Sequence, residues 1–237
     1  MKILAFETSA KSGSVALVED GRLLAENYVD VGLTHSATLL GMAKDLLDRC
    51  ELKASMLDSV ACAIGPGSFT GIRIGLAAAK GFAWGAGISC YGVSTLEAMA
   101  IAFSGLFDGI ICPVMDARRS QLYNALFLSA PGRRMVRLTE DRAIRAEDLA
   151  EEFKRPDHAG KKILLIGDGI EVTTRLIPNN SDLIVPQASI KRQHASGVAL
   201  AAYEMHLAGK TGSAEMLTPN YLRLSQAERE FLEKQNR

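Results

Sequence analysis

The feature that most constrains the fold is a pattern of strands and turns that occurs twice along the chain. An apolar strand over 3–6 ends at Glu7, and a second over 110–115 ends at Asp116, 109 residues later. Each is followed by a short polar turn and a returning strand. Two further apolar strands end at Ile64 and Ile166, and a Gly-x-Gly sequence follows each of them. Two copies of one strand order predict a two-lobed α/β protein whose halves face each other across a cleft.

The first half predicts a sheet that alternates with helices. Three antiparallel strands open it, and Asp20-Gly21 is a strong hairpin signal between the second and the third. Apolar residues at helical spacing then predict the first helix. The expected elements are strands over 3–6, 15–18 and 22–28, a helix over 36–50, a strand over 58–64, a helix over 72–85, a strand over 89–93 and a helix from Ser94.

The second half has fewer clear elements. We expect strands over 110–115, 121–128 and 163–166, a helix after Gly169, a last helix over 195–207 and a frayed charged tail over 228–237. The domain boundary is placed near residue 105. Residues 1–105 then form the first lobe and 106–237 a smaller second lobe, with the C-terminal segment packing back on the first.

Composition excludes several classes of protein. The chain has 237 residues, is 48% hydrophobic and carries 27 basic and 27 acidic side chains, which argues against disorder and against a strongly basic nucleic-acid binder. Residues 115–162 are mildly basic, which suits either a solvated face or a weak contact surface for an anionic partner. No signal peptide or membrane-spanning stretch is recognisable, and four cysteines without a CxxC pair predict free thiols in a cytoplasmic protein.

The most conspicuous local motif is the loop Gly65-Pro66-Gly67-Ser68-Phe69-Thr70-Gly71, which joins a predicted strand to a predicted helix. Backbone N–H groups at such a helix N-terminus can hold an anion. The loop contains no Gly-Lys-Ser/Thr and is therefore no Walker A motif. Two interpretations stay open: a tight turn with close backbone packing, or a phosphate contact. The candidate anion ligands are Gly65, Gly67, Ser68, Thr70 and Gly71.

The helix that follows carries small residues at every fourth position: Gly71, Gly75, Ala79, Ala83 and Gly87. One of its faces is therefore almost bare of side chain. Because glycine weakens a helix by about 1 kcal/mol, close packing against another element is the expected compensation. That element is either the protein's own sheet or a helix of another subunit.

Catalytic and metal-binding constellations are not recognisable. The four histidines form neither HxxxH nor HExxH, no Cys/His spacing suits zinc, and no GxSxG elbow occurs. Glu7 and Asp116, at equivalent turn positions, suit either metal- or phosphate-facing acids or local hydrogen-bond acceptors. His35 begins the first predicted helix, where an ordinary surface histidine is expected. We therefore assign no catalytic and no metal-binding residue.

Several motifs in order along the chain resemble one known family. They are residues 3–19, Gly65-Pro66-Gly67-Ser68-Phe69-Thr70-Gly71-Ile72-Arg73-Ile74-Gly75, Gly92-Val93-Ser94-Thr95-Leu96, Asp116-Ala117-Arg118-Arg119 and Pro219-Asn220-Tyr221-Leu222-Arg223. Together they resemble the bacterial TsaB (YeaZ) family of tRNA threonylcarbamoyladenosine synthesis. The likeness spans almost the whole chain. Glu7 departs from it, because the family's first strand usually ends in Asp.

The resemblance implies the fold of the actin/Hsp70/sugar-kinase superfamily with two duplicated lobes. It implies a non-catalytic, activating subunit of the complex that transfers threonylcarbamoyl from threonylcarbamoyl-AMP to the adenosine beside the anticodon of tRNA. The expected partners are the paralogue TsaD, the ATPase TsaE, a second copy through the same surface and, indirectly, tRNA. ATP and a metal ion are expected on the partner subunits, with no cofactor on this chain.

In this family the first-lobe helices pack against the paralogue. The expected interface residues here are His35, Leu39, Met42, Leu46, Gly71, Gly75 and Ala79. Arg118 and Arg119 are the candidate contacts for tRNA. Two other functions remain as alternatives. One is an independent small-molecule kinase of the same superfamily, and the other is a peptidase, against which the absent nucleophile and metal motifs argue.

Overall fold

The structure is a computed structural model that describes residues 1–158, 160–177, 181–187 and 192–223. Its first lobe contains a five-stranded sheet in the order β3-β2-β1-β4-β5. The strands are β1 (Lys2–Glu7), β2 (Gly13–Glu19), β3 (Arg22–Val29), β4 (Ser59–Gly65) and β5 (Ser89–Ser94). Strands β1, β2 and β3 pair antiparallel, whereas β4 pairs parallel with β1 and β5.

The second lobe repeats this order. Its sheet runs β10-β7-β6-β11-β12, with β6–β7 and β7–β10 antiparallel and β6–β11 and β11–β12 parallel. These strands are β6 (Gly109–Asp116), β7 (Gln121–Asn124), β10 (Arg142–Arg145), β11 (Ile163–Ile166) and β12 (Leu183–Ile184). Each strand of the first sheet therefore has a counterpart at the same place and in the same direction in the second.

The helices follow the duplication as well. They are α1 (His35–Arg49), α2 (Phe69–Ala86), α3 (Thr95–Ile101), α4 (Ala146–Glu152), α5 (Ile170–Leu176) and α6 (Ala195–Leu207), with one 3-10 turn at Ala54–Met56. In each half, one helix follows the third strand, one joins the fourth to the fifth, and one follows the fifth. This confirms the predicted α/β fold with two duplicated lobes. No helix in the described ranges is both long and apolar enough to cross a membrane.

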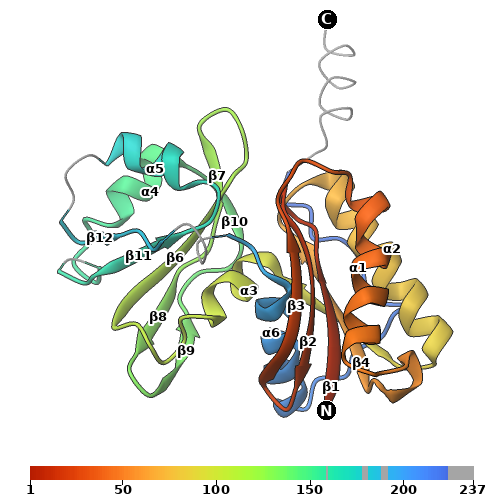
Figure 1. Ribbon diagram of the computed structural model, residues 1–237. Helices are drawn as coiled ribbons and strands as arrows, with labels where there is room; N and C mark the ends of the chain where they lie inside the picture. The colour runs from red at the N-terminus through yellow and green to blue at the C-terminus, as the bar shows by residue number, and fades with distance from the viewer. Residues whose placement is uncertain (159, 178–180, 188–191, 224–237) are drawn as a thin grey trace, which may run out of the picture.

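The two lobes exchange their last helices. Alternation along β1 turns Leu4 and Phe6 toward the cluster with α1 and α2, while Ile3 and Ala5 face α6. Helix α6 comes from the second half of the sequence but covers the inner face of the first sheet. Helix α3 comes from the first half, and its Met99 packs on the second sheet. Both helices lie between the sheets, whereas α1 and α2 flank the molecule on one side and α4 and α5 on the other (Figure 1).

Most predicted elements are confirmed, and one is wrong. The hairpin at Asp20-Gly21 has both residues at positive φ, 50° and 78°, as its tight turn requires. The single strand expected over 121–128 is two strands, β7 and β8 (Phe127–Ala130). Between them the buried Asn124 side chain donates to the backbone oxygens of Pro113 and Ala125, both at 3.1 Å. Strand β7 therefore pairs with the last residues of β6, and β8 pairs with its first residues.

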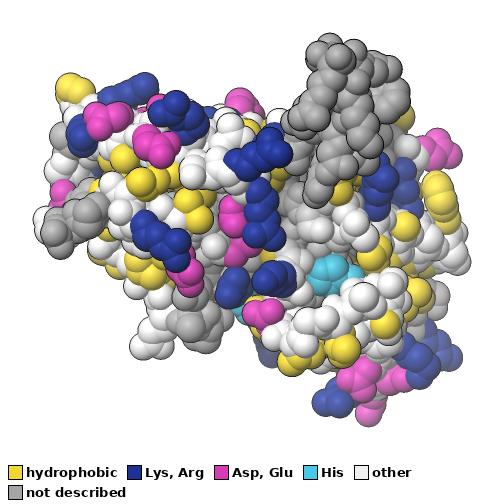
Figure 2. All heavy atoms as spheres, turned by 90° about the horizontal axis from the view of Figure 1, so that it is seen from above, with side chains coloured by type: hydrophobic (Ala, Val, Ile, Leu, Met, Phe, Trp, Pro, Cys, Tyr) yellow, Lys and Arg dark blue, Asp and Glu magenta, His cyan; other side chains and the backbone are white. Residues whose placement is uncertain are grey.

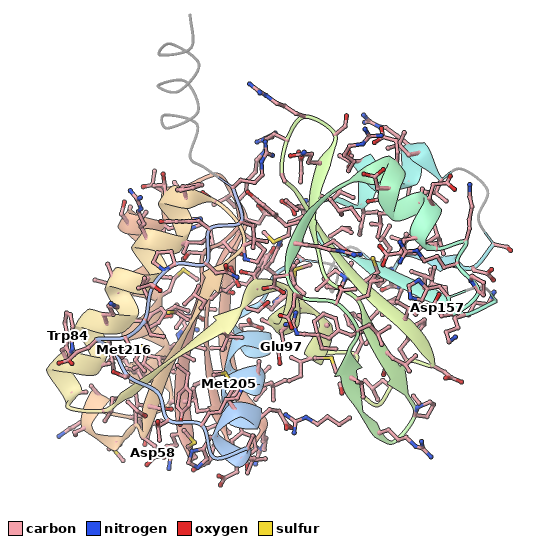
Figure 3. All side chains as sticks on the ribbon, turned by 180° about the vertical axis from the view of Figure 1, so that it is seen from behind. Asp58, Trp84, Glu97, Asp157, Met205 and Met216 are labelled. Carbon is pink, nitrogen blue, oxygen red and sulfur yellow. The ribbon has the colours of Figure 1, made fainter. Side chains whose placement is uncertain are left out.

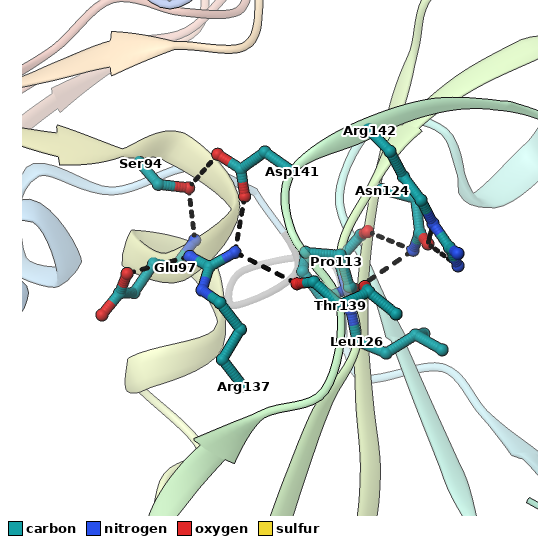
Figure 4. A network of polar contacts seen from close by, with 10 residues as sticks. Ser94, Glu97, Pro113, Asn124, Leu126, Arg137, Thr139, Asp141 and Arg142 are labelled. Atoms are coloured by element: carbon teal, nitrogen blue, oxygen red, sulfur yellow. Dashed lines mark hydrogen bonds and ion pairs between the residues drawn. The ribbon is translucent and has the colours of Figure 1, made fainter.

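A polar network joins α3 to the second lobe. Arg137, at the end of β9 (Arg133–Arg137), binds Asp141 at 2.7 Å and Glu97 at 2.9 Å. Asp141 also accepts a hydrogen bond from the Ser94 hydroxyl, 2.6 Å away, at the start of α3. Figure 4 shows these contacts beside the separate cluster around Asn124 and Arg142. The network fixes the inner helix to the strand hairpin of the other lobe. The predicted charged tail at 228–237 lies outside the described residues.

Candidate functional site

A cavity with a volume of about 600 Å³ lies between the lobes, where the duplicated β1 and β6 strands end. The turn after β1, the start of α2 and the β6–β7 turn surround it. Its lining residues are Ser9, Ala10, Lys11, Gly67, Ser68, Phe69, Thr70, Met115, Asp116, Ala117, Arg118, Tyr123, Asp168, Arg192 and Arg223. Both halves therefore contribute equivalent strand ends to one cavity.

The structure divides the predicted glycine loop in two. Gly67, Ser68 and Thr70 line the cavity. Gly65 and Gly71 do not, because a Cβ on Gly65 would lie 2.5 Å from the Asn220 oxygen and one on Gly71 would lie 2.0 Å from the Thr8 oxygen. Those two glycines permit close backbone packing. Close backbone packing also holds for Gly67, where a Cβ would lie 2.5 Å from the Ser9 oxygen, and the phosphate contact stays a prediction.

The acid that ends β1 is enclosed by protein. Glu7 is only 1% exposed, and its Oε1 accepts a hydrogen bond of 2.6 Å from the Ser9 N–H. Burial raises the pKa of the Glu7 carboxyl to about 7. Glu7 is not among the residues that line the cavity, although Ser9, to which it is hydrogen-bonded, is one of them. Its counterpart Asp116 does line the cavity, and its Oδ1 accepts from the Arg118 N–H at 2.7 Å.

The candidate tRNA contacts lie in the β6–β7 turn. Arg118, Arg119 and Ser120 all have positive φ, between 56° and 66°. Three successive left-handed residues without glycine are uncommon and cost free energy. The turn is held by the Asp116 carboxylate and by Arg223, which donates to the Ala117 oxygen. The Arg118 guanidinium projects from this turn at the edge of the cavity, 3.5 Å from Asp116 Oδ2.

A C-terminal strap, residues 217–223, crosses from one lobe to the other. Its Asn220 N–H donates to the Ile64 oxygen at 2.7 Å, and its Tyr221 ring stacks on Phe69 with the centroids 4.1 Å apart. Arg73 donates to the Tyr221 hydroxyl at 2.7 Å. Arg223 then reaches the β6–β7 turn. The sequence singled out 219–223 as a motif, but not its contact with the glycine loop.

Five of the seven residues expected at the partner interface pack inside the chain, and the other two are partly exposed. Leu39, Leu46 and Ala79 are at most 2% exposed and belong to the core of the first lobe. Gly71 and Gly75 pack on Thr8, where a Cβ on Gly75 would lie 2.3 Å from Thr8 Oγ1. The bare face of α2 therefore packs on the protein's own sheet.

The two remaining interface candidates are also engaged within the chain. His35 is half-buried, and its Nε2 lies 2.9 Å from the Ala10 oxygen. Met42 is half-buried, and its backbone oxygen accepts from Asn27 at 3.0 Å. His35 and Met42 are thus partly exposed, and their place at a partner interface stays a prediction.

The outer surface of this layer has a different set of small and apolar residues. Leu40 on α1 is 59% exposed and Trp84 on α2 is 61% exposed. A Cβ on Gly41, Gly81 or Gly85 would meet no atom within 4 Å. Figure 3 shows Trp84 at the outer flank of the first lobe, far from the second. A face with exposed aromatic and aliphatic side chains beside bare helix backbone suits close packing against other helices.

The described residues contain no group of three or more His, Cys, Asp or Glu that could hold a metal ion. All four cysteines are free thiols, and three of them are buried. Burial raises the pKa of the Cys112 thiol to about 12. None of the four cysteines is among the residues that line the cavity.

The chain is similar to proteins of one family over almost its whole length. A family model described as TsaD, tRNA N6-adenosine threonylcarbamoyltransferase, matches residues 30–231. The Bacillus subtilis tRNA threonylcarbamoyladenosine biosynthesis protein TsaB is 31% identical, covering 99% of this chain and 100% of its own. The Escherichia coli protein of the same name is 30% identical, covering 94% and 95%.

A solved structure agrees with this likeness. YeaZ from Pseudomonas aeruginosa superposes with a TM-score of 0.78 at 26% identity, covering 93% of this chain and 99% of that one. These relatives match the chain over almost its whole length. The matched part includes the duplicated sheets and the glycine loop at the start of α2. By sequence and by fold, this chain belongs to the TsaB (YeaZ) family, within the wider family described by the TsaD model.

Proposed function

We propose that this protein is the non-catalytic, activating subunit of a tRNA threonylcarbamoyladenosine-forming complex, and that it docks on a TsaD-type catalytic subunit through the outer face of α1 and α2. The observation that carries the proposal is this exposed face in a chain of the TsaB family. This face is formed by Leu40, Trp84 and three glycines with open space around them, Gly41, Gly81 and Gly85. Two helices with bare backbone positions allow two partner helices to approach closely.

The charge of this face also suits docking. In the described part of α1, Lys44 pairs with Asp48 at 2.5 Å and Arg49 with Asp45 at 3.1 Å. These pairs continue along α1 in line with Leu40 and Gly41, and within each pair the charges neutralise one another. A partner helix would thus meet Leu40, Trp84 and the open glycines beside paired charges that leave no net charge on this part of the face. The same face would serve for a second copy of this chain when the catalytic partner is absent.

The remaining components of the complex have separate roles in this proposal. A TsaE-type ATPase and the catalytic subunit would supply the ATP and metal sites. The tRNA would be bound mainly by the other subunits, with Arg118 and Arg119 as the contribution of this chain. Their side chains project from the strained β6–β7 turn. Reversing both charges is expected to weaken tRNA binding by the complex, and an unchanged affinity would remove this contact from the proposal.

The test is a reconstituted modification assay with threonylcarbamoyl-AMP, substrate tRNA, the catalytic subunit and the ATPase. We expect tRNA modification to require this chain. Trp84→Ala is expected to lower the apparent affinity for the catalytic subunit about tenfold or more, because a buried tryptophan is a typical interface hot spot. Leu106→Ala is the matched control, since Leu106 is 78% exposed and lies outside the α1–α2 layer.

Two results would contradict the proposal. If modification proceeds at the same rate without this chain, the role as an activating subunit is wrong. If Trp84→Ala and Leu106→Ala bind the catalytic subunit as tightly as the unchanged chain, the outer face of α1 and α2 is not the docking surface. Thermal melts of both variants would show that the comparison is between folded proteins.

A further inference from the structure

A second pocket lies between the lobes, at the other end of their junction from the first cavity. Helices α3 and α6, strands β8 and β9 and the turn at Gly21 surround it, and its volume is about 380 Å³ (Figure 1). Gly21 follows Glu19, which pairs with Lys2 at the start of β1, whereas the first cavity lies where β1 ends. Figure 2 shows that first end from above, with Lys and Arg side chains gathered at the junction.

The second pocket differs in charge, because two Arg–Glu pairs line it. Both arginines lie on β9: Arg134 binds Glu204 of α6, and Arg137 binds Glu97 of α3, each at 2.9 Å. All four side chains belong to the lining, which therefore carries two positive and two negative charges. A simple anion or cation would meet as many like charges as opposite ones. A zwitterion, which carries both charges, is the complementary ligand.

We propose that the second pocket binds a free α-amino acid with an apolar side chain, whose carboxylate contacts Arg134 and whose ammonium group contacts Glu204. This inference concerns the chain alone and does not depend on the proposed function.

The Arg134–Glu204 pair is the one that a ligand can open. Its two side chains are 62% and 33% exposed, and exposed ion pairs contribute little to stability. Arg137 is more enclosed, since it is 25% exposed and binds Asp141 at 2.7 Å as well as Glu97 (Figure 4). An amino acid between Arg134 and Glu204 would replace one ion pair by two. Arg137 and Glu97 would keep their contact and form a fixed wall of the pocket.

The distance between the charges limits the class of zwitterion. The Arg134 guanidinium and the Glu204 carboxylate are in direct contact, so a ligand that binds both must carry its own charges close together. In an α-amino acid the ammonium and carboxylate groups are attached to one carbon, whereas γ-aminobutyrate holds them farther apart. Ser104 adds a hydroxyl to the lining. Its Oγ accepts from the Met135 N–H at 2.9 Å, and it can donate its own proton to the ligand carboxylate.

The rest of the lining is mostly apolar and suits the side chain of the amino acid. Ile101 and Leu200 pack on the core of the first lobe, whereas Phe127 and Met135 pack in the core of the second. A branched or aromatic side chain placed here would cover apolar surface of both lobes. A volume of about 380 Å³ is that of a small-molecule site. The ligand would thus connect α6, which covers the first sheet, with β9 of the second.

The experiment is calorimetric titration of the full chain with L-leucine and, separately, with L-phenylalanine. We expect saturable binding of both. N-acetyl-L-leucine lacks the ammonium group and L-leucinamide lacks the carboxylate, so each should bind about tenfold or more weakly than L-leucine. γ-Aminobutyrate should also bind more weakly, because its charges are farther apart and it has no apolar side chain. Glu204→Gln and Arg134→Gln should each weaken the binding of L-leucine about tenfold or more.

The matched control is Glu147→Gln, which removes the partner of Arg145. Arg145 is also 62% exposed, and its pair with Glu147 lies outside the pocket. Thermal melts without ligand would show that all three variants are folded. Absence of saturable binding of both amino acids at millimolar concentration would overturn the proposal. Equal affinities for L-leucine and N-acetyl-L-leucine, or an equal loss of affinity in Glu147→Gln and Glu204→Gln, would also overturn it.

Discussion

Gly75 shows how one residue sets the distance between a helix and the sheet beneath it. A Cβ at this position would lie 2.3 Å from Thr8 Oγ1, and the Thr8 hydroxyl already donates to the Gly71 oxygen at 2.7 Å. Thr8 is itself buried and cannot move away. We expect Gly75→Ala to lower the free energy of unfolding by about 1–3 kcal/mol, even though alanine favours helix by about 1 kcal/mol. Urea denaturation of the monomer measures this change.

The control lies on the same helix. A Cβ on Gly81 would meet no atom within 4 Å, so Gly81→Ala should stabilise the monomer by up to about 1 kcal/mol. The sequence pattern identified the row of small residues but not the element it contacts, because helical spacing says nothing about which neighbour is present. Equal effects at Gly75 and Gly81 would show that the inner face is not closely packed.

Glu7 makes stability depend on pH in an unusual direction. Burial raises its pKa from 4.5 to about 7, so between these values the folded chain keeps a proton that the unfolded chain has released. The contribution of Glu7 to the free energy of unfolding therefore falls as the pH rises through this range and stays low above it. Glu7→Gln keeps an acceptor for the Ser9 N–H and removes the charge.

We expect the stability of Glu7→Gln relative to the unchanged chain to increase between pH 5 and pH 8, by an amount on the order of a few kcal/mol. Denaturant titrations across this pH range measure the difference. Glu171→Gln controls for the loss of one exposed acidic group. A difference for Glu7→Gln that stays constant with pH would mean that the Glu7 carboxyl ionises normally in the folded protein.

At the scale of elements, the C-terminal strap stabilises the start of α2. The rings of Phe69 and Tyr221 stack at an interplanar angle of 14°, and the Arg73 guanidinium lies 5.6 Å from the Tyr221 centroid. A double-mutant cycle with Phe69→Ala and Tyr221→Ala should give a coupling free energy of about 0.5–1.5 kcal/mol. Tyr221→Phe keeps the stacking and removes the hydroxyl that Arg73 binds, so its loss should be smaller. A coupling near zero would show that the strap does not hold α2.

The elements also show where prediction from sequence succeeds. Strands with strong apolar patterns were predicted to within a residue or two, as at 163–166, and so were long helices such as 195–207. The elements β9, β10 and α4 gave no comparable signal, because they are short and half-exposed. The break between β7 and β8 depends on hydrogen bonds of the Asn124 side chain to residues distant in sequence. Local pattern cannot report such contacts.

The candidate sites were predictable only in outline. The sequence located the glycine loop and the acidic strand ends, and these meet in the cavity through Gly67, Ser68, Thr70 and Asp116. It did not find Lys11, Arg192 or Arg223, which are isolated cations in three separate segments. Only the return of the chain after α6 brings Arg223 to the β6–β7 turn. Sites built from single residues of distant segments carry no spacing signal.

At the scale of the whole molecule, the exchange of helices makes the two lobes depend on each other. The inner face of the first sheet is covered by α6, whose Ala195, Val198 and Ala202 are fully buried against it. The start of α6 is also fixed to this sheet, since Ser14 Oγ accepts from the Ala195 N–H at 2.8 Å. Residues 1–105 alone would expose this apolar face. The boundary between the halves of the sequence is therefore not a boundary between independent cores.

We expect a fragment of residues 1–105 to bind a hydrophobic dye and to lack a cooperative unfolding transition, because its five-stranded sheet would have one apolar face exposed to water. Joining 1–105 to 192–223 through a flexible linker should restore cooperative unfolding, since α6 and the strap then cover the sheet and the glycine loop. Circular dichroism and dye fluorescence during urea titration compare the two chains. If residues 1–105 alone unfold as cooperatively as the full chain, the first lobe is self-sufficient and α6 contributes only to the contact between the lobes.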